Sequence, residues 1–380
     1  MNEVTALLEA SGLAHLSWQA PIMWVIGALF VWLGIKKNIE PLLLVPIGFC
    51  VMMVNMPLGG LMDDGSGEHG IPGIFYIFNE YGLRTDLIPC LIFLGLGAMT
   101  DFGPLIANPK TLLLGAAAQL GVFVAFLGAI MMGFTMEEAS SIGIIGGADG
   151  PTTIFTATNL GVSDVVLGAC AISAYSYMAM VPIIQPPIIR LLTTPEERGM
   201  TMKQLRPVNK TEKMLFPVIG ALVITLLVPK STPLITMFML GNLFMTCGVV
   251  DRLRDAARNE LMNVVTILLG IAVGSTMVGE DFLTPQVLGI YLLGLVAFSV
   301  STAGGLIFAK IMNLFLKEKI NPLLGSAGVS AVPMAARVSQ QMGNEANPKC
   351  YILMHAMGPN VAGVVGTVIA SAIFITLVGG

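Results

Sequence analysis

Long apolar runs recur along nearly the whole 380-residue chain and are separated by shorter polar stretches. A helix needs about 20 mostly apolar residues to cross the hydrocarbon core of a bilayer. The pattern therefore predicts an all-α polytopic membrane protein with about ten transmembrane helices. The predicted spans are residues 21–35, 42–58, 87–107, 111–134, 165–189, 214–228, 233–250, 261–278, 286–309 and 351–378.

Two further segments, 140–160 and 321–340, are apolar but dense in glycine, proline and polar side chains. Hydrocarbon accepts interrupted helices only where protein or a hydrated cavity satisfies their free backbone groups. We therefore expect both segments to be broken helices that lie inside the protein.

The charged residues predict which side of the membrane each loop faces. Loop 190–213 is the longest loop and the richest in Lys and Arg, so it is expected on the cytoplasmic side. Acidic residues such as Glu138 and Glu280 are expected outside. Ten spans fit these sides only if 140–160 enters from outside and returns, and 321–340 enters from inside and returns. Both broken segments are thus predicted to be re-entrant.

The two halves of the chain resemble each other. Ile-Phe-Leu-Gly at 92–95 parallels Ile-Leu-Leu-Gly at 267–270, and each half continues with a span, a broken segment and a long span. Because the halves begin on opposite sides, the pattern predicts an inverted repeat, although a match of generic apolar composition is the alternative. The predicted regions are an N-terminal two-span segment with an outer loop (1–86), a first repeat (87–190), a basic loop with two linking spans (191–260) and a second repeat (261–380).

Composition narrows the class of protein. Hydrophobic residues make up 55% of the chain and charged residues 11%, against about 25% charged in a soluble domain, which excludes a soluble enzyme. The net charge of -4 comes with no basic tail, so no nucleic-acid partner is expected. The 43 glycines and 22 prolines are typical of transporters, whose helices are broken and closely packed. No lysine has the neighbours that receive biotin, so no biotin is expected on this chain.

The first broken segment places Asp149 within Gly-Gly-Ala-Asp-Gly-Pro. Burying a carboxylate at the centre of a membrane costs about 2.5–3.5 kcal/mol, so Asp149 requires a cation, a proton or a basic partner. A neutral, hydrogen-bonded Asp149 that packs two helices is the alternative.

The second broken segment offers the neutral oxygens of Asn321, Ser326 and Ser330. Together with one carboxylate charge, such oxygens suit Na⁺ better than a divalent ion, and proton coupling remains the alternative. Arg337, which ends the segment, could pair with Asp149, attract an anionic substrate group or anchor the helix at the cytoplasmic face.

Further polar residues interrupt the long spans that follow each broken segment. Asn360 follows Gly358-Pro359 and adds an amide oxygen where the proline frees a backbone carbonyl. Tyr175, at an equivalent place in the first half, could line a water path or be a core aromatic.

At these residues the chain resembles the beta subunits of the bacterial sodium-pumping biotin-dependent decarboxylases, which act with oxaloacetate, methylmalonyl-CoA or glutaconyl-CoA. The resemblance covers nearly the whole chain. It is carried by residues 40–44, 46–49, 97–105, 143–151, 174–179, 185–187, 321–338 and 354–363.

The resemblance implies roles for individual residues. Candidate sodium ligands are Asp149, as the principal residue, with Asn321, Asn360, Ser330 and Gly325. Candidate catalytic residues are Arg337, Tyr175 and Ser330, and Arg337 is also the candidate contact for carboxybiotin.

The resemblance also implies the activity. A biotin-bearing alpha subunit would deliver carboxybiotin to this chain, whose decarboxylation would consume a proton and export Na⁺ across the bacterial inner membrane. A small gamma or delta subunit and further beta subunits are expected in the complex. The outer loop 59–81 is shorter than in some oxaloacetate-type members, which leaves the carboxyl donor open. The alternative function is a stand-alone carrier that couples Na⁺ to an organic anion.

Overall fold

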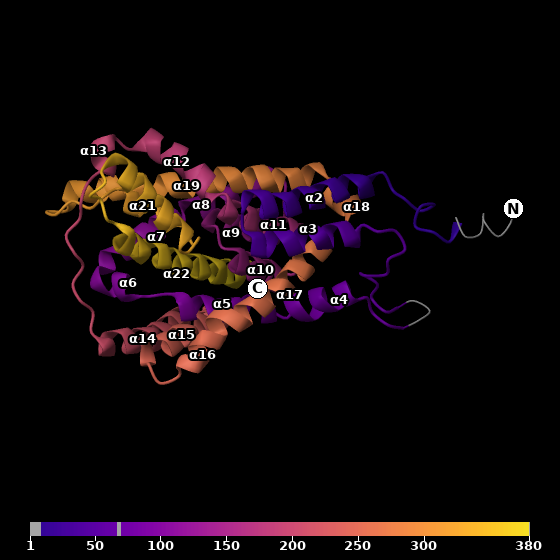
Figure 1. Ribbon diagram of the computed structural model, residues 1–380, viewed down its shortest axis with the longest axis horizontal. Helices are drawn as coiled ribbons and strands as arrows, with labels where there is room; N and C mark the ends of the chain where they lie inside the picture. The colour runs from indigo at the N-terminus through magenta and orange to yellow at the C-terminus, as the bar shows by residue number, and fades with distance from the viewer. Residues whose placement is uncertain (1–8, 67–69, 380) are drawn as a thin grey trace.

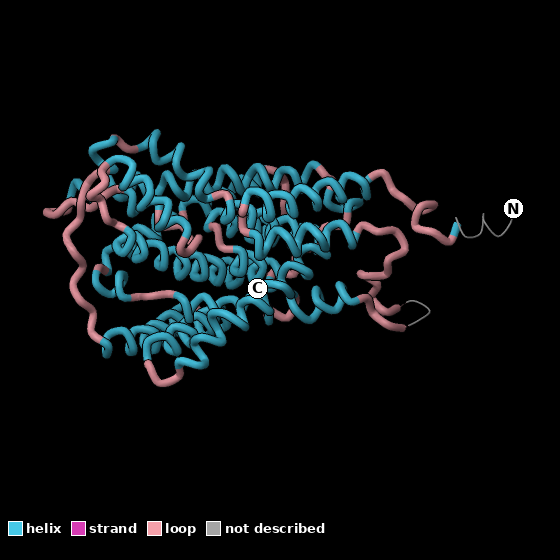
Figure 2. The backbone as a smooth tube through the Cα atoms, in the orientation of Figure 1, coloured by secondary structure: helices cyan, strands magenta, loops and turns pink. Residues whose placement is uncertain are grey.

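The computed structural model describes residues 9–66 and 70–379, and within these ranges every regular element is a helix. Figures 1 and 2 show an elongated molecule whose helices run mostly along its long axis. The predicted all-α architecture is therefore confirmed. Residues 1–8 and 67–69 of the predicted region 1–86 lie outside the described residues.

The first half of the chain contains short helices, one π-helix and several long apolar helices. They are α2 (Gln19–Lys37), α3 (Pro41–Val54), α4 (Ile74–Phe78), η1 (Asn79–Leu83), α5 (Leu87–Met99), α6 (Gly103–Ala107), η2 (Pro109–Thr111), α7 (Leu112–Ala118), α8 (Leu120–Met131), α9 (Met136–Ile144), η3 (Ile145–Gly147), α10 (Gly150–Asn159), α11 (Asp164–Ala179) and α12 (Val181–Leu192).

The second half has a similar composition of elements. They are α13 (Pro195–Arg198), α14 (Lys210–Leu227), η4 (Pro229–Ser231), α15 (Thr232–Cys247), α16 (Asp251–Ala256), η5 (Ala257–Leu261), α17 (Met262–Ser275), α18 (Gly279–Phe282), α19 (Pro285–Phe315), α20 (Leu323–Ser326), α21 (Met334–Ala346) and α22 (Leu353–Val378).

Several of these helices can cross a membrane. Among the described residues, five helical stretches are long and apolar enough, and two bent pairs raise the number to seven if each pair is one span. Helices α3 and α15 occupy two further predicted spans, but their 14 and 16 residues fall short of the roughly 20 that a span needs. The chain is therefore a multi-span helical membrane protein. The five stretches are Gln19–Lys37, Pro109–Met131, Asp251–Ser275, Pro285–Phe315 and Leu353–Val378.

Two predicted spans are not single straight helices. The predicted span 87–107 ends at Met99, where Thr100 adopts an extended backbone, and the chain resumes as α6. The predicted span 165–189 bends by 65° between α11 and α12. Pro182 follows that bend, and because proline has no N–H, it cannot continue the hydrogen bonding of α11.

The first broken segment is a hairpin made by α9, η3 and α10. A capping box between Thr135 and Glu138 begins α9, and Ser163 caps α11 just after the segment. Glu138 and Ser163 line the same cavity. The two ends of this segment therefore lie at the same end of the molecule.

The second broken segment, with α20 and α21, is also a hairpin. Asn321 Nδ2 lies 3.6 Å from Cys350 Sγ, and Gln340 Nε2 donates a hydrogen bond to the Cys350 carbonyl at 2.7 Å. Both ends of the segment thus lie beside one residue, Cys350.

The two hairpins enter from opposite ends of the molecule. Ion pairs join loop 199–209 and its flanks to the ends of other elements, including Lys203 with Glu318, Lys310 with Glu197 and Lys213 with Asp101. This basic end contains the open side of the second hairpin. Each such exposed pair contributes only about 0–1 kcal/mol, so the pairs indicate position more than stability.

The two halves also place their elements in the same order. A short helix, a π-helix and an apolar helix occur as α4, η1 and α5, and again as α16, η5 and α17. A long helix, a broken hairpin and a further long helical stretch follow in each half. In addition, α3 packs against α17 and α15 packs against α5, so the opening helices of each half contact the other half.

Close helix packing depends on particular glycines, which gives a test of the fold. A Cβ at Gly97 of α5 would lie 1.9 Å from the Phe238 carbonyl oxygen of α15. We expect Gly97→Ala to destabilise the protein by about 1–3 kcal/mol through overpacking and to lower its melting temperature in detergent. The control is Gly220→Ala, where the nearest atom, Met239 Cε, lies 3.6 Å from the added Cβ. Equal melting temperatures for the two variants would contradict this packing.

Candidate functional site

Asp149 lies at the break of the first hairpin. Ala148 before it has a φ of 54°, so the chain leaves the helical path there. Asp149 Oδ1 then caps α10 by accepting a hydrogen bond from the Thr152 N–H at 3.0 Å. Asp149 is 5% exposed, and its Oδ2 has no hydrogen-bond partner in the part of the chain that the structure describes. A buried carboxylate with one unused oxygen can take a cation or a proton.

The sequence allows this break because small residues surround it. A Cβ at Gly146 would lie 2.5 Å from the Gly121 carbonyl oxygen of α8. A Cβ at Gly150 would lie 2.4 Å from the Tyr175 ring. The ring of Tyr175 therefore packs directly against the backbone beside Asp149.

The tips of the two hairpins meet in the interior. The Ser330 N–H donates a hydrogen bond to the Gly147 carbonyl at 2.9 Å. Asn360 Nδ2 of α22 donates to the Val329 carbonyl at 2.7 Å and the Ala331 carbonyl at 3.3 Å. Asn360 is fully buried, and among the described residues its Oδ1 has no hydrogen-bond partner.

A cavity of about 320 Å³ gathers four of the predicted site residues: Asp149, Tyr175, Ser330 and Arg337. Its walls come from both hairpin tips and from α3, α5, α11 and α17. Met99, at the end of α5 near the ion pair of Asp101 and Lys213, also lines it. The cavity therefore extends from Asp149 toward the basic end.

Arg337 is an exposed cation on the wall of this cavity. In the described ranges it forms no ion pair, so the direct pairing with Asp149 that the sequence left open is not present. Its guanidinium is available to an anion that enters the cavity, and a guanidinium binds carboxylates in a bidentate manner.

Two predicted ligands lie elsewhere. Asn321 Nδ2 donates to the carbonyls of Arg198 and Met200, both at 2.9 Å, and its Oδ1 accepts from the Leu323 N–H at 2.9 Å. Its amide thus fixes the loop at the basic end. Gly325 contacts α19, because a Cβ there would lie 2.0 Å from the Gly305 carbonyl oxygen. Neither residue lines the cavity of Asp149.

Glu40 is a cavity residue that sequence reasoning missed as a site candidate. It precedes α3, has a φ of 35° and lines the cavity together with Arg337. A charged residue directly before an apolar run was the available signal, but it resembles an ordinary helix boundary. Only the packing of α3 against α17 brings Glu40 to the cavity.

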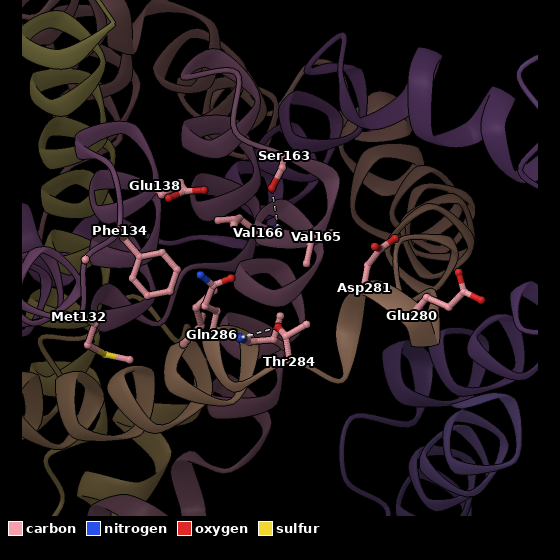
Figure 3. A pocket seen from close by; sticks show the side chains of 13 residues that line it. Met132, Phe134, Glu138, Ser163, Val165, Val166, Glu280, Asp281, Thr284 and Gln286 are labelled. Atoms are coloured by element: carbon pink, nitrogen blue, oxygen red, sulfur yellow. Dashed lines mark hydrogen bonds between the residues drawn. The ribbon is translucent and has the colours of Figure 1, made fainter. Parts of the chain in front are cut away.

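The opposite end of the molecule carries an acidic cavity of about 320 Å³, shown in Figure 3. Glu138, Glu280 and Asp281 line it, as does Ser163. Glu138 Oε2 accepts from the Thr135 N–H at 3.0 Å and so belongs to a helix cap. The two ends therefore differ in charge.

A multi-span helical protein with a buried carboxylate between two broken hairpins is of the class of integral membrane proteins. The model of the family described as Na⁺-transporting oxaloacetate decarboxylase beta subunit matches residues 19–378, and the chain belongs to that family. The resemblance noted in the sequence is thereby confirmed.

Curated relatives cover essentially the whole chain. The glutaconyl-CoA decarboxylase subunit beta of Acidaminococcus fermentans is 52% identical, covering 99% of this chain and 98% of the relative. The methylmalonyl-CoA decarboxylase subunit beta of Propionigenium modestum is 51% identical, with 100% of both covered. The oxaloacetate decarboxylase beta chain 2 of Salmonella typhi is 47% identical, with 100% of this chain and 99% of the relative covered.

These findings settle the class of activity. The chain is the membrane-integral beta subunit of a sodium-transporting, biotin-dependent decarboxylase, which is a multi-subunit complex. The comparisons support this function and not the stand-alone carrier.

Asn360 gives a test of how the hairpin tips are held. We expect Asn360→Asp to destabilise the protein by about 1–3 kcal/mol, because the carbonyls of Val329 and Ala331 lose their donor in a buried site. Melting in detergent measures this. The control is Asn259→Asp, whose amide donates only to the exposed Asp255 carbonyl. A melting temperature for Asn360→Asp equal to that of the control would refute the assigned role.

Proposed function

We propose that this subunit decarboxylates carboxybiotin and uses the reaction to export Na⁺ through the site at Asp149. The supporting observation is the single cavity that contains both the unpaired Arg337 cation and the Asp149 carboxylate. An anionic substrate and a cationic cargo therefore find complementary charges within one space.

Arg337 is the proposed contact for the carboxylate of carboxybiotin, which a partner subunit carries to the basic end. In the reaction the bond between the carboxyl carbon and the biotin nitrogen breaks and CO₂ leaves. The electron pair stays on that nitrogen, which then takes up a proton. Tyr175 and Ser330, on the same cavity, are the proposed catalytic partners.

Sodium is the proposed cargo at Asp149. The unpartnered Oδ2 of Asp149, the unpartnered Oδ1 of Asn360 and the Ser330 hydroxyl are oxygen ligands of the kind that a hard monovalent cation prefers. The proposed contributions of Asn321 and Gly325 are indirect, through the second hairpin. A proton on Asp149 would remove the charge that holds the ion, so proton and Na⁺ would exclude each other.

The energy of the reaction is of a suitable size. Moving one charge against the membrane potential costs about 2.3 kcal/mol per 100 mV, so one or two Na⁺ at ~150 mV require roughly 3.5–7 kcal/mol. A decarboxylation can supply this amount.

The proposal includes a ten-span inverted repeat with two re-entrant hairpins and alternating access to a midplane site. The repeated order of elements in the two halves supports this proposal. The proposal is also supported by the two hairpins, which open at opposite ends of the molecule. The regions 1–86, 87–190, 191–260 and 261–380 remain our proposed division of the chain.

The proposed complex contains a biotin-bearing alpha subunit, a small gamma or delta subunit and further copies of the beta subunit in the bacterial inner membrane. The physiological donor is an acid or acyl-CoA of the kinds named for the relatives. In the proposed mechanism the alpha subunit determines which of these donors is used, because the donor itself does not enter the proposed cavity.

The carboxylate of Asp149 gives the direct test. We expect Asp149→Asn to reduce sodium-stimulated CO₂ release from carboxybiotin about a hundredfold or more, because a buried cation loses its counter-charge. The assay uses the reconstituted complex, and the control is Asp63→Asn in the exposed outer loop. Sodium stimulation that survives in Asp149→Asn would refute the proposed ion site.

Arg337 tests the other half of the cavity. Lysine keeps a positive charge but not the bidentate contact to a carboxylate, so we expect Arg337→Lys to slow CO₂ release roughly tenfold or more. The sodium concentration for half-maximal rate should stay close to that of the wild type. Unchanged decarboxylation in this variant would remove Arg337 from the mechanism.

A further inference from the structure

The hydroxyl of Ser330 is held by a second hydroxyl. Ser330 Oγ lies 2.6 Å from Thr367 Oγ1 of α22, and both groups are buried. Each hydroxyl has one proton and two lone pairs. Which of the two donates decides whether Ser330 offers the cavity a proton or only lone pairs.

Gln119, at the junction of α7 and α8, settles the direction of this bond. Its Nε2 lies 3.2 Å from the Gly115 carbonyl oxygen and 3.2 Å from the Gly363 carbonyl oxygen. Carbonyls only accept, so the amide NH₂ must face them. The other end of the amide, Oε1, therefore faces Thr367 Oγ1 at 3.1 Å.

Thr367 must then donate away from Ser330. Its hydroxyl has two neighbours that can only accept, Gln119 Oε1 at 3.1 Å and the Gly363 carbonyl oxygen at 3.1 Å. Whichever of them takes the Thr367 proton, the short contact with Ser330 requires that Ser330 donates. The proton of Ser330 thus points at Thr367.

We propose that Gln119 and Thr367 are positioning residues that make Ser330 an acceptor-only ligand for the transported cation. With its proton directed at Thr367, Ser330 presents only lone pairs to the cavity. Lone pairs bind a cation, whereas an anion would require the proton. The inference rests on the proposed sodium site, and it assigns a role there to residues outside the cavity wall.

Packing holds this chain of hydrogen bonds in one arrangement. A Cβ at Gly147 would lie 2.7 Å from Thr367 Oγ1, so Thr367 contacts both hairpin tips. A Cβ at Gly363 would lie 2.2 Å from the Gly328 carbonyl oxygen. The absence of side chains at these two glycines brings α22 close enough to fix the Ser330 hydroxyl.

The test replaces Thr367 by residues of similar size. Thr367→Val removes the acceptor for the Ser330 proton, and we expect the sodium concentration for half-maximal CO₂ release to rise roughly 5- to 30-fold. Thr367→Ser keeps the hydroxyl and should behave as the wild type. The control is Thr376→Val, on the same helix, whose hydroxyl donates only to the Ala372 carbonyl.

A second readout does not depend on turnover. The sodium concentration that half-maximally raises the melting temperature of the complex should shift in Thr367→Val by the same factor. In a Ser330→Ala background, Thr367→Val should add no further shift, because the hydroxyl that it orients is gone. A merely structural role of Thr367 would make the two changes additive.

If Thr367→Val does not fold, Gln119→Leu provides the test of whether Thr367 orients the Ser330 hydroxyl. This variant removes Oε1 but leaves the Gly363 carbonyl as acceptor, so a smaller rise in the same direction is expected. The inference would be overturned if the folded variant kept the sodium dependence of the wild type, or if its effect added to that of Ser330→Ala. In either case, loss of the sodium response in Asp149→Asn would show that the proposed sodium site itself still stands. Wild-type protein without any sodium response would instead overturn the proposed function.

Discussion

The hydrogen bond from the Ser330 N–H to the Gly147 carbonyl joins the two helix breaks, and the polar site depends on that junction. Each break removes backbone groups from helical hydrogen bonding, which an apolar interior does not tolerate unless partners are supplied. The two hairpin tips provide some of these hydrogen-bond partners for each other. The side chains of Asn360 and Asp149 provide further partners. In the described part of the chain, the side-chain oxygens left unpartnered around the junction include those of Asp149 and Asn360. The proposed cation site thus lies where the backbone groups of both breaks have hydrogen-bond partners.

The two ends of the molecule on either side of this junction differ in charge. The cavity extends from Asp149 toward the basic end, at which loop 199–209 forms its ion pairs, and Arg337 is exposed on the cavity wall. The acidic cavity with Glu280 and Asp281 lies at the other end. At the basic end, the hydrogen bond from the Arg190 guanidinium lowers the pKa of Glu345, so Glu345 is a carboxylate at neutral pH. An anionic group brought by a partner and a cation leaving at the far side are both consistent with this arrangement.

Much of this arrangement could be predicted from sequence because it depends on local chemistry. Glycine and proline around Asp149 predict a break, and the Lys and Arg pattern predicts the end at which each hairpin opens. The bends after Met99 and at Met180 were missed, since apolar composition does not distinguish a straight helix from a bent pair. Asn321 was predicted as an ion ligand, and the structure places it outside the cavity of Asp149, where its Nδ2 donates to the basic loop and its Oδ1 accepts from the Leu323 N–H. Glu40, Gln119 and Thr367 depend on contacts between residues far apart in sequence, which periodicity does not reveal.

The central claim is that decarboxylation and sodium movement are one process, and vectorial transport tests it most directly. Inside-out vesicles that contain the beta subunit would be supplied with carboxybiotin on its carrier subunit, and radioactive sodium uptake and CO₂ release would be followed together. The account predicts that sodium accumulates in the vesicles only while carboxybiotin is consumed, and that omitting the carrier stops both. Sodium uptake that continues without any biotin-bearing subunit, or CO₂ release that leaves sodium outside, would contradict it.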